Sequence, residues 1–238
     1  MVKKISLIQI IYGVIGIGLV IMVHEIGHWF FCKLFGVATP EFAVGFGPTL
    51  FETDIGTTRF TLNLIPLGGY VEILGMRNII PGFEAFSFAA KPLWQQVTIL
   101  LGGILFNLIF GFATLAIVAP SRLRRKPLPK EASEDPALHP KGAIGPLGIL
   151  ALISRSALYG PRLYAIFLAL ISLNLAIFNL LPLPILDGGQ LLIVLIQAAT
   201  GTMLSTQAYD LITTITLFLL VFLFLITTSK DIQRTVSD

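Results

Sequence analysis

The sequence predicts an integral membrane protein that is all-α apart from a small β element. Hydrophobic residues make up 55% of its 238 residues and charged residues only 12%, whereas a soluble domain carries about 25% charged residues. Three uncharged stretches could cross a hydrocarbon core, which takes about 20 apolar residues: Ile5–Val23, Leu93–Ala119 and Leu211–Ser229. A fourth, Leu163–Leu186, is interrupted near its end by prolines. We therefore expect about four transmembrane helices in one domain, residues 1–238, with a membrane-associated β-hairpin between the first and second.

The first predicted span lies within residues 1–35, which open with MVKK before the apolar run. A signal peptide begins in the same way, but the run is long and no small-residue cleavage site follows it, which favours a retained span. The only basic cluster, Arg122–Lys126 together with Lys130, follows the second span. A cluster in that position is typical of contact with a membrane surface and does not indicate a nucleic-acid partner.

Residues 40–75 differ from the spans on either side because they are rich in β-branched, aromatic and glycine residues. The sequence DIGTT predicts a turn that joins two short strands, roughly 49–53 and 59–65. Non-helical backbone at membrane depth must be covered by protein or line a cavity. The apolar character of these strands therefore predicts a hairpin that reaches into the membrane domain beside a buried polar site.

The second half of the chain divides into a linker and two further spans. Residues 121–145 form a polar linker with four prolines and mixed charge, too short for a separate domain. Residues 163–200 hold the third span and, after its prolines, the sequence LDGG and a helix over 188–200 that is too short to cross a membrane. The last span is predicted at 211–229.

The sequence VHEIGH at the end of the first apolar run predicts a metal site. His24 and His28 are four residues apart, so on a helix both point to one side, and two imidazoles at this spacing suit zinc. Glu25 lies about 100° further around the helix, close enough to hold a water molecule as a general base. Ionisable groups inside a span are expensive and functional by default. The alternative is a helix end whose histidines merely lie at the interface.

A tetrahedral zinc site needs a third protein ligand besides two histidines and a water. The candidate is Asp187 in NLLPLPILDGG, the only carboxylate between Asp135 and Asp210. Pro182 and Pro184 break the helix ahead of it, and the two glycines after it let the backbone bend sharply, which would expose the carboxylate to a cavity. The alternative is a helix N-cap. Beside an incomplete metal site, ligation is the better interpretation.

These motifs together resemble the site-2 protease family of intramembrane zinc metalloproteases, in its bacterial form. HEIGH in the first span, GFGP and IPLGGYV between spans, and NLLPLPILDGG in a later span carry the resemblance over residues 5–201. The resemblance implies that His24, His28 and Asp187 bind Zn²⁺ and that Glu25 is the catalytic base.

The resemblance also implies two substrate-binding residues. GGILFN in the second span matches the family's GxxxN feature, which brings Asn107 near the active site. Asn179 holds the asparagine position of the family's NxxPxPxLDG motif, which helps to bind the substrate backbone. Bacterial relatives usually carry one or two PDZ domains between the second and third spans, and the linker 121–145 leaves no room for one. Selectivity is then expected from the membrane core, the hairpin or a separate adaptor.

The function implied by the resemblance is cleavage of transmembrane segments of single-span membrane proteins or signal-peptide remnants, as in regulated intramembrane proteolysis. The expected setting is the lipid bilayer of the bacterial inner (cell) membrane, with an upstream protease as a further candidate partner. The alternative is a non-catalytic zinc-binding or zinc-transporting membrane protein. A transporter is expected to carry ligands along a path, whereas this sequence offers one compact set.

Two arguments predict opposite orientations of the protein in the membrane. Most of the Lys and Arg residues lie in the N-terminus, the linker and the C-terminus, so the positive-inside rule places both termini in the cytoplasm. The resemblance implies the opposite orientation. Both arguments agree that the zinc lies on the side of the hairpin, because the hairpin region follows HEIGH directly.

Overall fold

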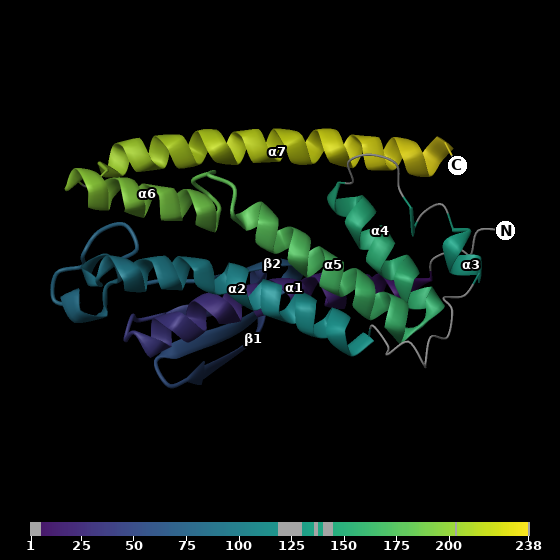
Figure 1. The fold of residues 1–238 in the computed structure, drawn as a ribbon, viewed down its shortest axis with the longest axis horizontal. Helices are drawn as coiled ribbons and strands as arrows, with labels where there is room; N and C mark the ends of the chain where they lie inside the picture. The colour runs from purple at the N-terminus through teal and green to yellow at the C-terminus, as the bar shows by residue number, and fades with distance from the viewer. Residues whose placement is uncertain (1–5, 119–129, 136–137, 140–144, 203, 238) are drawn as a thin grey trace.

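The computed structural model describes residues 6–118, 130–135, 138–139, 145–202 and 204–237. Among these residues four helices are long and apolar enough to cross a membrane (Figure 1). They are α1 (Leu7–Leu34), α2 (Leu93–Val118), α5 (Pro161–Asn179) and α7 (Thr206–Ser237). The predicted fold class, a membrane all-α protein with a small β element, is confirmed.

Shorter elements connect these four helices. A hairpin follows α1, two 3₁₀ turns precede α2, and one short helix lies between α5 and α7. The elements are β1 (Glu41–Ile55), β2 (Thr58–Val71), η1 (Glu84–Phe86), η2 (Phe88–Ala90), α3 (Lys130–Ser133), α4 (Pro146–Ser156), η4 (Ala157–Tyr159) and α6 (Asp187–Thr200). Most of the predicted linker 121–145 lies outside the described residues. Helix α4, which follows it, has no counterpart in the sequence-based prediction.

Helix α1 continues through HEIGH without interruption, well beyond the apolar run that predicted it. Apart from the adjacent pair Gly27 and His28, its buried residues are spaced three or four apart and therefore form one face: Gly13, Gly16, Val20, His24, Gly27, His28 and Cys32. The polar residues do not end the helix because they point into the protein and not into lipid. Two apolar clusters lie along this face on either side of the histidines, one containing Val20 and the other Cys32.

Helices α1 and α2 approach each other to backbone contact. A Cβ atom on Gly27 would collide with the carbonyl group of Gly102, and a Cβ atom on Gly102 would lie 2.6 Å from the carbonyl oxygen of Gly27. Small residues at a crossing of membrane helices allow such an approach. The contact brings the face of α1 that carries the histidines directly against α2.

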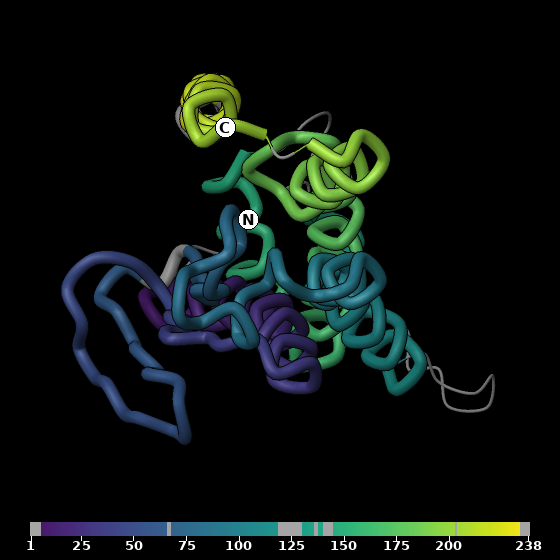
Figure 2. The backbone as a smooth tube through the Cα atoms, turned by 90° about the vertical axis from the view of Figure 1, so that its left-hand side faces the viewer, coloured from purple at the N-terminus to yellow at the C-terminus, as the bar shows by residue number. Residues whose placement is uncertain are grey.

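The hairpin is longer than predicted but turns where the sequence predicts. Ile55 lies opposite Thr58, so the turn falls within DIGTT. The first part of β1 is paired on both sides, since Ala43 lies opposite both Thr61 and Tyr70. This double pairing accounts for the extra length. Both strands extend beyond their predicted bounds at the end away from the turn, where β2 reaches the surface of α1. Figure 2 shows the outer loop of the hairpin projecting away from the helices.

The base of the hairpin packs on α1 beside the predicted catalytic base. A Cβ atom on Gly69 of β2 would lie 3.4 Å from Ile21 Cγ2 and 3.6 Å from Glu25 Cγ. The predicted position of the hairpin next to a buried polar site is therefore observed.

The turn between α5 and α6 folds back on itself. Helix α5 ends at Asn179, and Leu183 and Leu186 close the turn with backbone hydrogen bonds to Leu181 and Leu183. A Cβ atom on Gly188 or Gly189 would collide with the backbone of this turn. The two glycines are thus required by close packing and not, as the sequence analysis expected, by a sharp bend at their own positions.

Helix α7 lies along the outside of the protein and is held at both ends (Figures 1 and 2). Near its start, Asp210 accepts a hydrogen bond of 2.7 Å from Arg77. Near its end, the Asp231 carboxylate accepts hydrogen bonds from the backbone N–H groups of Gly145 and Gly148 at the start of α4. Between these ties most of its side chains are exposed, as suits a helix that faces lipid.

Substitution of Gly27 should separate α1 from α2. We expect Gly27→Ala to lower the thermal stability of the detergent-purified protein, because overpacking against a backbone group typically costs about 1–3 kcal/mol. Gly18→Ala in the same helix is the matched control: a Cβ atom there would meet no atom within 4 Å, so the melting temperature should not fall. A Gly27→Ala variant that melts with the wild type would contradict the close-contact assignment.

Candidate metal centre

Two histidine side chains meet in the interior of the protein. His24 and His28 lie one turn apart on α1, and 6% and 5% of their surfaces are exposed. Their Nε2 atoms are 3.2 Å apart. The spacing read from the sequence therefore does bring both imidazoles to one point.

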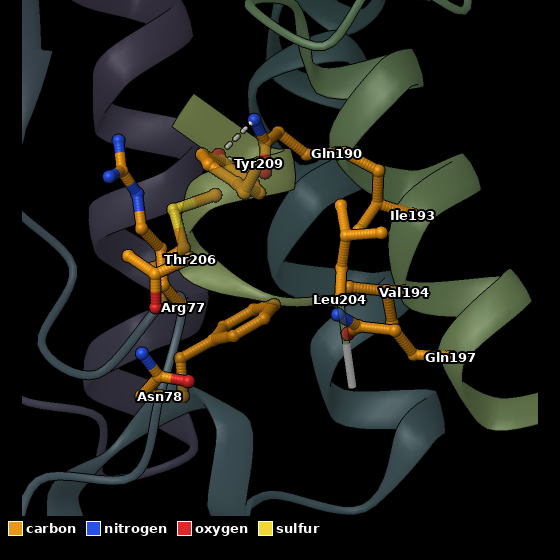
Figure 3. A pocket seen from close by; sticks show the side chains of 11 residues that line it. Arg77, Asn78, Gln190, Ile193, Val194, Gln197, Leu204, Thr206 and Tyr209 are labelled. Carbon is orange, nitrogen blue, oxygen red and sulfur yellow. Dashed lines mark hydrogen bonds between the residues drawn. The ribbon is translucent and has the colours of Figure 1, made fainter. Parts of the chain in front are cut away.

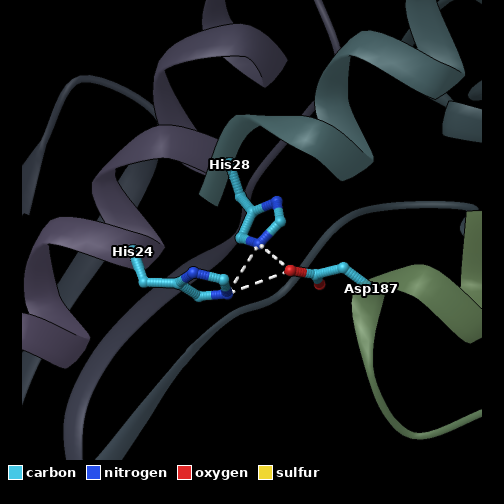
Figure 4. Close-up of side chains that lie close together, drawn as sticks. All are labelled: His24, His28 and Asp187. Atoms are coloured by element: carbon cyan, nitrogen blue, oxygen red, sulfur yellow. Dashed lines mark hydrogen bonds and ion pairs between the residues drawn. The ribbon is translucent and has the colours of Figure 1, made fainter. Parts of the chain in front are cut away.

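Asp187 completes the group from the first turn of α6. Its Oδ2 atom lies 3.1 Å from Nε2 of His24 and 3.4 Å from Nε2 of His28 (Figure 4). The N-cap position of α6 is taken by Leu186, so the N-cap interpretation of Asp187 is not supported. The turn between α5 and α6 points the carboxylate at the histidines.

The geometry of the three atoms suits a zinc ion. Ligands at about 2.0–2.1 Å around a tetrahedral centre lie about 3.3 Å from one another, and the three observed separations are 3.1, 3.2 and 3.4 Å. Asp187 Oδ2 is buried and has no hydrogen-bond partner. A buried carboxylate oxygen without a partner is costly, and a divalent cation among the three atoms removes that cost.

Helix α2 shapes the site from behind. The His28 ring lies with Nδ1 2.8 Å from the carbonyl oxygen of Ile99, so Nδ1 carries the proton and Nε2 is left free to bind a metal. A Cβ atom on Gly103 would collide with Nε2 of His28 and crowd the His24 ring. Glycine at this position therefore makes room for both imidazoles.

A cavity of about 380 Å³ opens beside the three ligand atoms. Its lining includes Glu25 of α1, Tyr70 and Val71 at the end of β2, Asn179 at the end of α5, and Gln190 of α6. The Glu25 side chain lies beside Val71 and the backbone of Gly69 at this end of β2. Partial burial and the neighbouring Glu41 carboxylate raise the pKa of the Tyr70 hydroxyl.

The two predicted substrate-binding asparagines occupy different environments. Asn179 lines the cavity, and its side-chain nitrogen donates to the carbonyl oxygen of Leu175 at 3.1 Å. Asn107 is completely buried, and its side-chain amide lies 3.3 Å from Nδ1 of His24. The described residues that line the cavity do not include Asn107.

Gln190 is a cavity-lining residue that the sequence motifs did not indicate. Its side chain lines the metal cavity and also a neighbouring pocket (Figure 3), where its side-chain nitrogen lies 2.6 Å from the Tyr209 hydroxyl. The Tyr209 ring in turn lies 4.4 Å from the guanidinium of Arg77. Gln190 could have been noticed as a polar residue about one turn after Asp187 in a largely apolar helix. The contribution of the Ile99 carbonyl could not, since backbone groups leave no mark in a sequence.

Comparison with known proteins identifies the family. A family model described as peptidase family M50 matches residues 12–223. The chain belongs to peptidase family M50. This membership confirms the resemblance to site-2 proteases that the motifs indicated.

Several M50 relatives carry the name "Putative zinc metalloprotease". A Thermotoga maritima protein is 44% identical over 106 residues, which are 43% of this chain and 21% of that protein. A Fusobacterium nucleatum protein is 38% identical over 108 residues, 45% of the chain and 31% of that protein. A Clostridium perfringens protein is 23% identical over 330 residues, 94% of the chain and 98% of that protein. The chain thus matches less than a third of the length of the first two.

The long alignment bears on the organisation of the chain. It covers 330 residues, more than the 238 of the chain itself, so the relative contains residues that have no counterpart here. The names of the relatives and the donor set of His24, His28 and Asp187 agree on Zn²⁺ as the cofactor.

Removal of the third ligand should release the metal. We expect Asp187→Ala to lose stoichiometric zinc, measured by elemental analysis of the purified protein. Two imidazoles alone leave zinc without the third protein ligand that such a site needs. The control is Asp210→Ala, which removes a carboxylate of the neighbouring α7 that contacts Arg77 and should keep its zinc. Full zinc occupancy in Asp187→Ala would exclude ligation by this residue.

Proposed function

We propose that this protein is an intramembrane zinc metalloendopeptidase that cleaves transmembrane segments of single-span membrane proteins or signal-peptide remnants. The observation that carries the proposal is the convergence of His24, His28 and Asp187 within 4.8 Å of one another, beside a cavity that also holds Glu25. When bound, Zn²⁺ supplies a Lewis acid that polarises a carbonyl group and lowers the pKa of water towards 7.

Glu25 is the general base of the proposed reaction. Its carboxylate lines the cavity on the same helix as both histidines, and Gly69 of β2 packs beside its side chain. From this position Glu25 takes a proton from the attacking water and gives it to the leaving amine. A purely structural three-ligand site has no need of this carboxylate.

The end of β2 and Asn179 hold the unwound substrate between them. Gly69, Tyr70 and Val71 pair with β1 along one edge, and Tyr70 and Val71 line the cavity. An extended peptide binds such a strand by adding to its edge. The amide of Asn179 lines the same cavity from α5; one N–H donates to Leu175, and the other N–H and the oxygen can bond to a peptide backbone.

Selectivity in this proposal comes from the membrane domain and its partners. The linker 121–145 is too short for a PDZ domain, and the excess length of the Clostridium perfringens relative agrees with a domain that this chain lacks internally. We propose that a separate adaptor or an upstream protease, acting at the bacterial inner membrane, prepares the substrate. The proposed process is regulated intramembrane proteolysis.

A non-catalytic zinc-binding or zinc-transporting protein is the alternative. Such a transporter needs ligands along a path, and among the described residues one group of His, Cys, Asp or Glu side chains is arranged to hold a metal. The described part of the chain therefore favours the protease.

Loss of the proposed base should separate catalysis from metal binding. We expect Glu25→Gln to lower cleavage of a single-span reporter by about 100- to 10,000-fold, the usual contribution of general acid–base catalysis, with zinc content unchanged. His24→Ala, measured in parallel, should lose both zinc and activity. Wild-type cleavage by Glu25→Gln would exclude the general-base role.

Helix stability of the substrate should limit its cleavage. We expect a reporter with a central Gly-Pro to be cleaved up to about 100-fold faster than an all-Leu span, because an interior proline destabilises a helix by about 3 kcal/mol relative to Ala. Both reporters are compared in vesicles, with a third that carries Gly-Pro at the far end of the span. Equal rates for all three would show that unwinding does not limit the reaction.

A further inference from the structure

Asn107 lies beside the metal site, on the side of the His24 ring that faces away from the cavity. Its side chain is completely buried, and the described cavity-lining residues do not include it. As placed, its side-chain nitrogen Nδ2 lies 3.3 Å from Nδ1 of His24, and its buried Oδ1 has no hydrogen-bond partner among the described residues. Its backbone carbonyl oxygen accepts a hydrogen bond of 2.9 Å from the Ser172 hydroxyl of α5.

The chemistry of His24 decides which amide atom faces it. Nε2 of His24 points at Asp187 and His28, so it must offer a lone pair to a metal, and the ring proton is then on Nδ1. A proton on Nδ1 needs an acceptor. Side-chain oxygen and nitrogen of an asparagine exchange places when the amide rotates by half a turn, and only the orientation with Oδ1 towards Nδ1 provides that acceptor.

We propose that Asn107 is a positioning residue that accepts the Nδ1 proton of His24 through its side-chain oxygen. This inference rests on the proposed ligation by His24. It gives both histidines an equivalent partner on α2, since His28 has the carbonyl oxygen of Ile99. Ile99, Gly103 and Asn107 are spaced by four residues and so form one stripe on α2, with an acceptor, a gap for the rings and a second acceptor.

The role differs in its consequences from substrate binding. A hydrogen-bond partner behind a metal ligand fixes the tautomer and orientation of the ring, and its loss typically weakens metal binding by about 10- to 100-fold. A residue that only contacts substrate changes KM and leaves metal affinity as it was. Zinc affinity measured without substrate therefore distinguishes the two roles.

The experiment compares variants of the full chain by chelator competition for Zn²⁺ and by the absorption spectrum of the Co²⁺-loaded protein. We expect Asn107→Leu, which has a similar size but no acceptor, to bind zinc about 10- to 100-fold more weakly and to alter the Co²⁺ spectrum. Asn107→Asp keeps an acceptor oxygen and should restore both readouts. If the Leu variant does not fold, Asn107→Ala makes the same comparison.

Ser172→Ala is the matched control. It removes the hydrogen bond to the backbone of Asn107 and leaves the side-chain contact with His24, so zinc affinity should stay at the wild-type value. Wild-type zinc affinity in Asn107→Leu with a raised KM would overturn the inference in favour of substrate binding. Equal losses in Asn107→Leu and Ser172→Ala would overturn it in favour of packing alone. Wild-type affinity in His24→Ala would instead refute the ligand set itself.

Discussion

The metal centre depends on the backbone contact between α1 and α2 at Gly27 and Gly102. A side chain at either position would push the helices apart. At the observed distance the Ile99 carbonyl oxygen reaches His28 Nδ1 at 2.8 Å, and the Asn107 amide reaches His24 Nδ1 at 3.3 Å. Helix packing in a membrane has little hydrophobic driving force and relies on close contact and hydrogen bonds. Here the same contact provides both the packing and the orientation of the imidazoles.

Asp187 reaches the histidines by a separate device. The turn after Asn179 folds onto the start of α6, and Gly188 and Gly189 admit this fold because a larger residue would strike the turn. The carboxylate is thereby held against two imidazoles in a largely apolar interior. Burying a carboxylate without a partner costs free energy. A cation bound by the three ligand atoms, which have tetrahedral spacing, would offset that cost. The site is therefore assembled for metal by the fold itself.

The elements around the centre are less firmly packed than α1 and α2. The outer hairpin and most of α7 present exposed side chains. Some of their contacts lie near the cavity: Gly69 of β2 packs beside Glu25, and Tyr209 of α7 contacts Gln190, which lines the cavity. A closely packed centre with less closely packed surroundings is compatible with the proposed entry of a transmembrane segment from the bilayer.

The sequence by itself determined the membrane class, the four spans, the turn of the hairpin within DIGTT, and the candidate ligands His24, His28 and Asp187. These features follow from hydrophobic runs, turn residues and the four-residue period of a helix, all of which are local. Only the tertiary structure decided the length and double pairing of β1, the presence of α4, and the partners of the two histidines. A backbone carbonyl such as that of Ile99 is the same in every residue, so its role arises from distances between helices that no local pattern encodes. For the same reason the sequence located Asn107 near the site, but the packing of α2 against α1 determined that it faces His24.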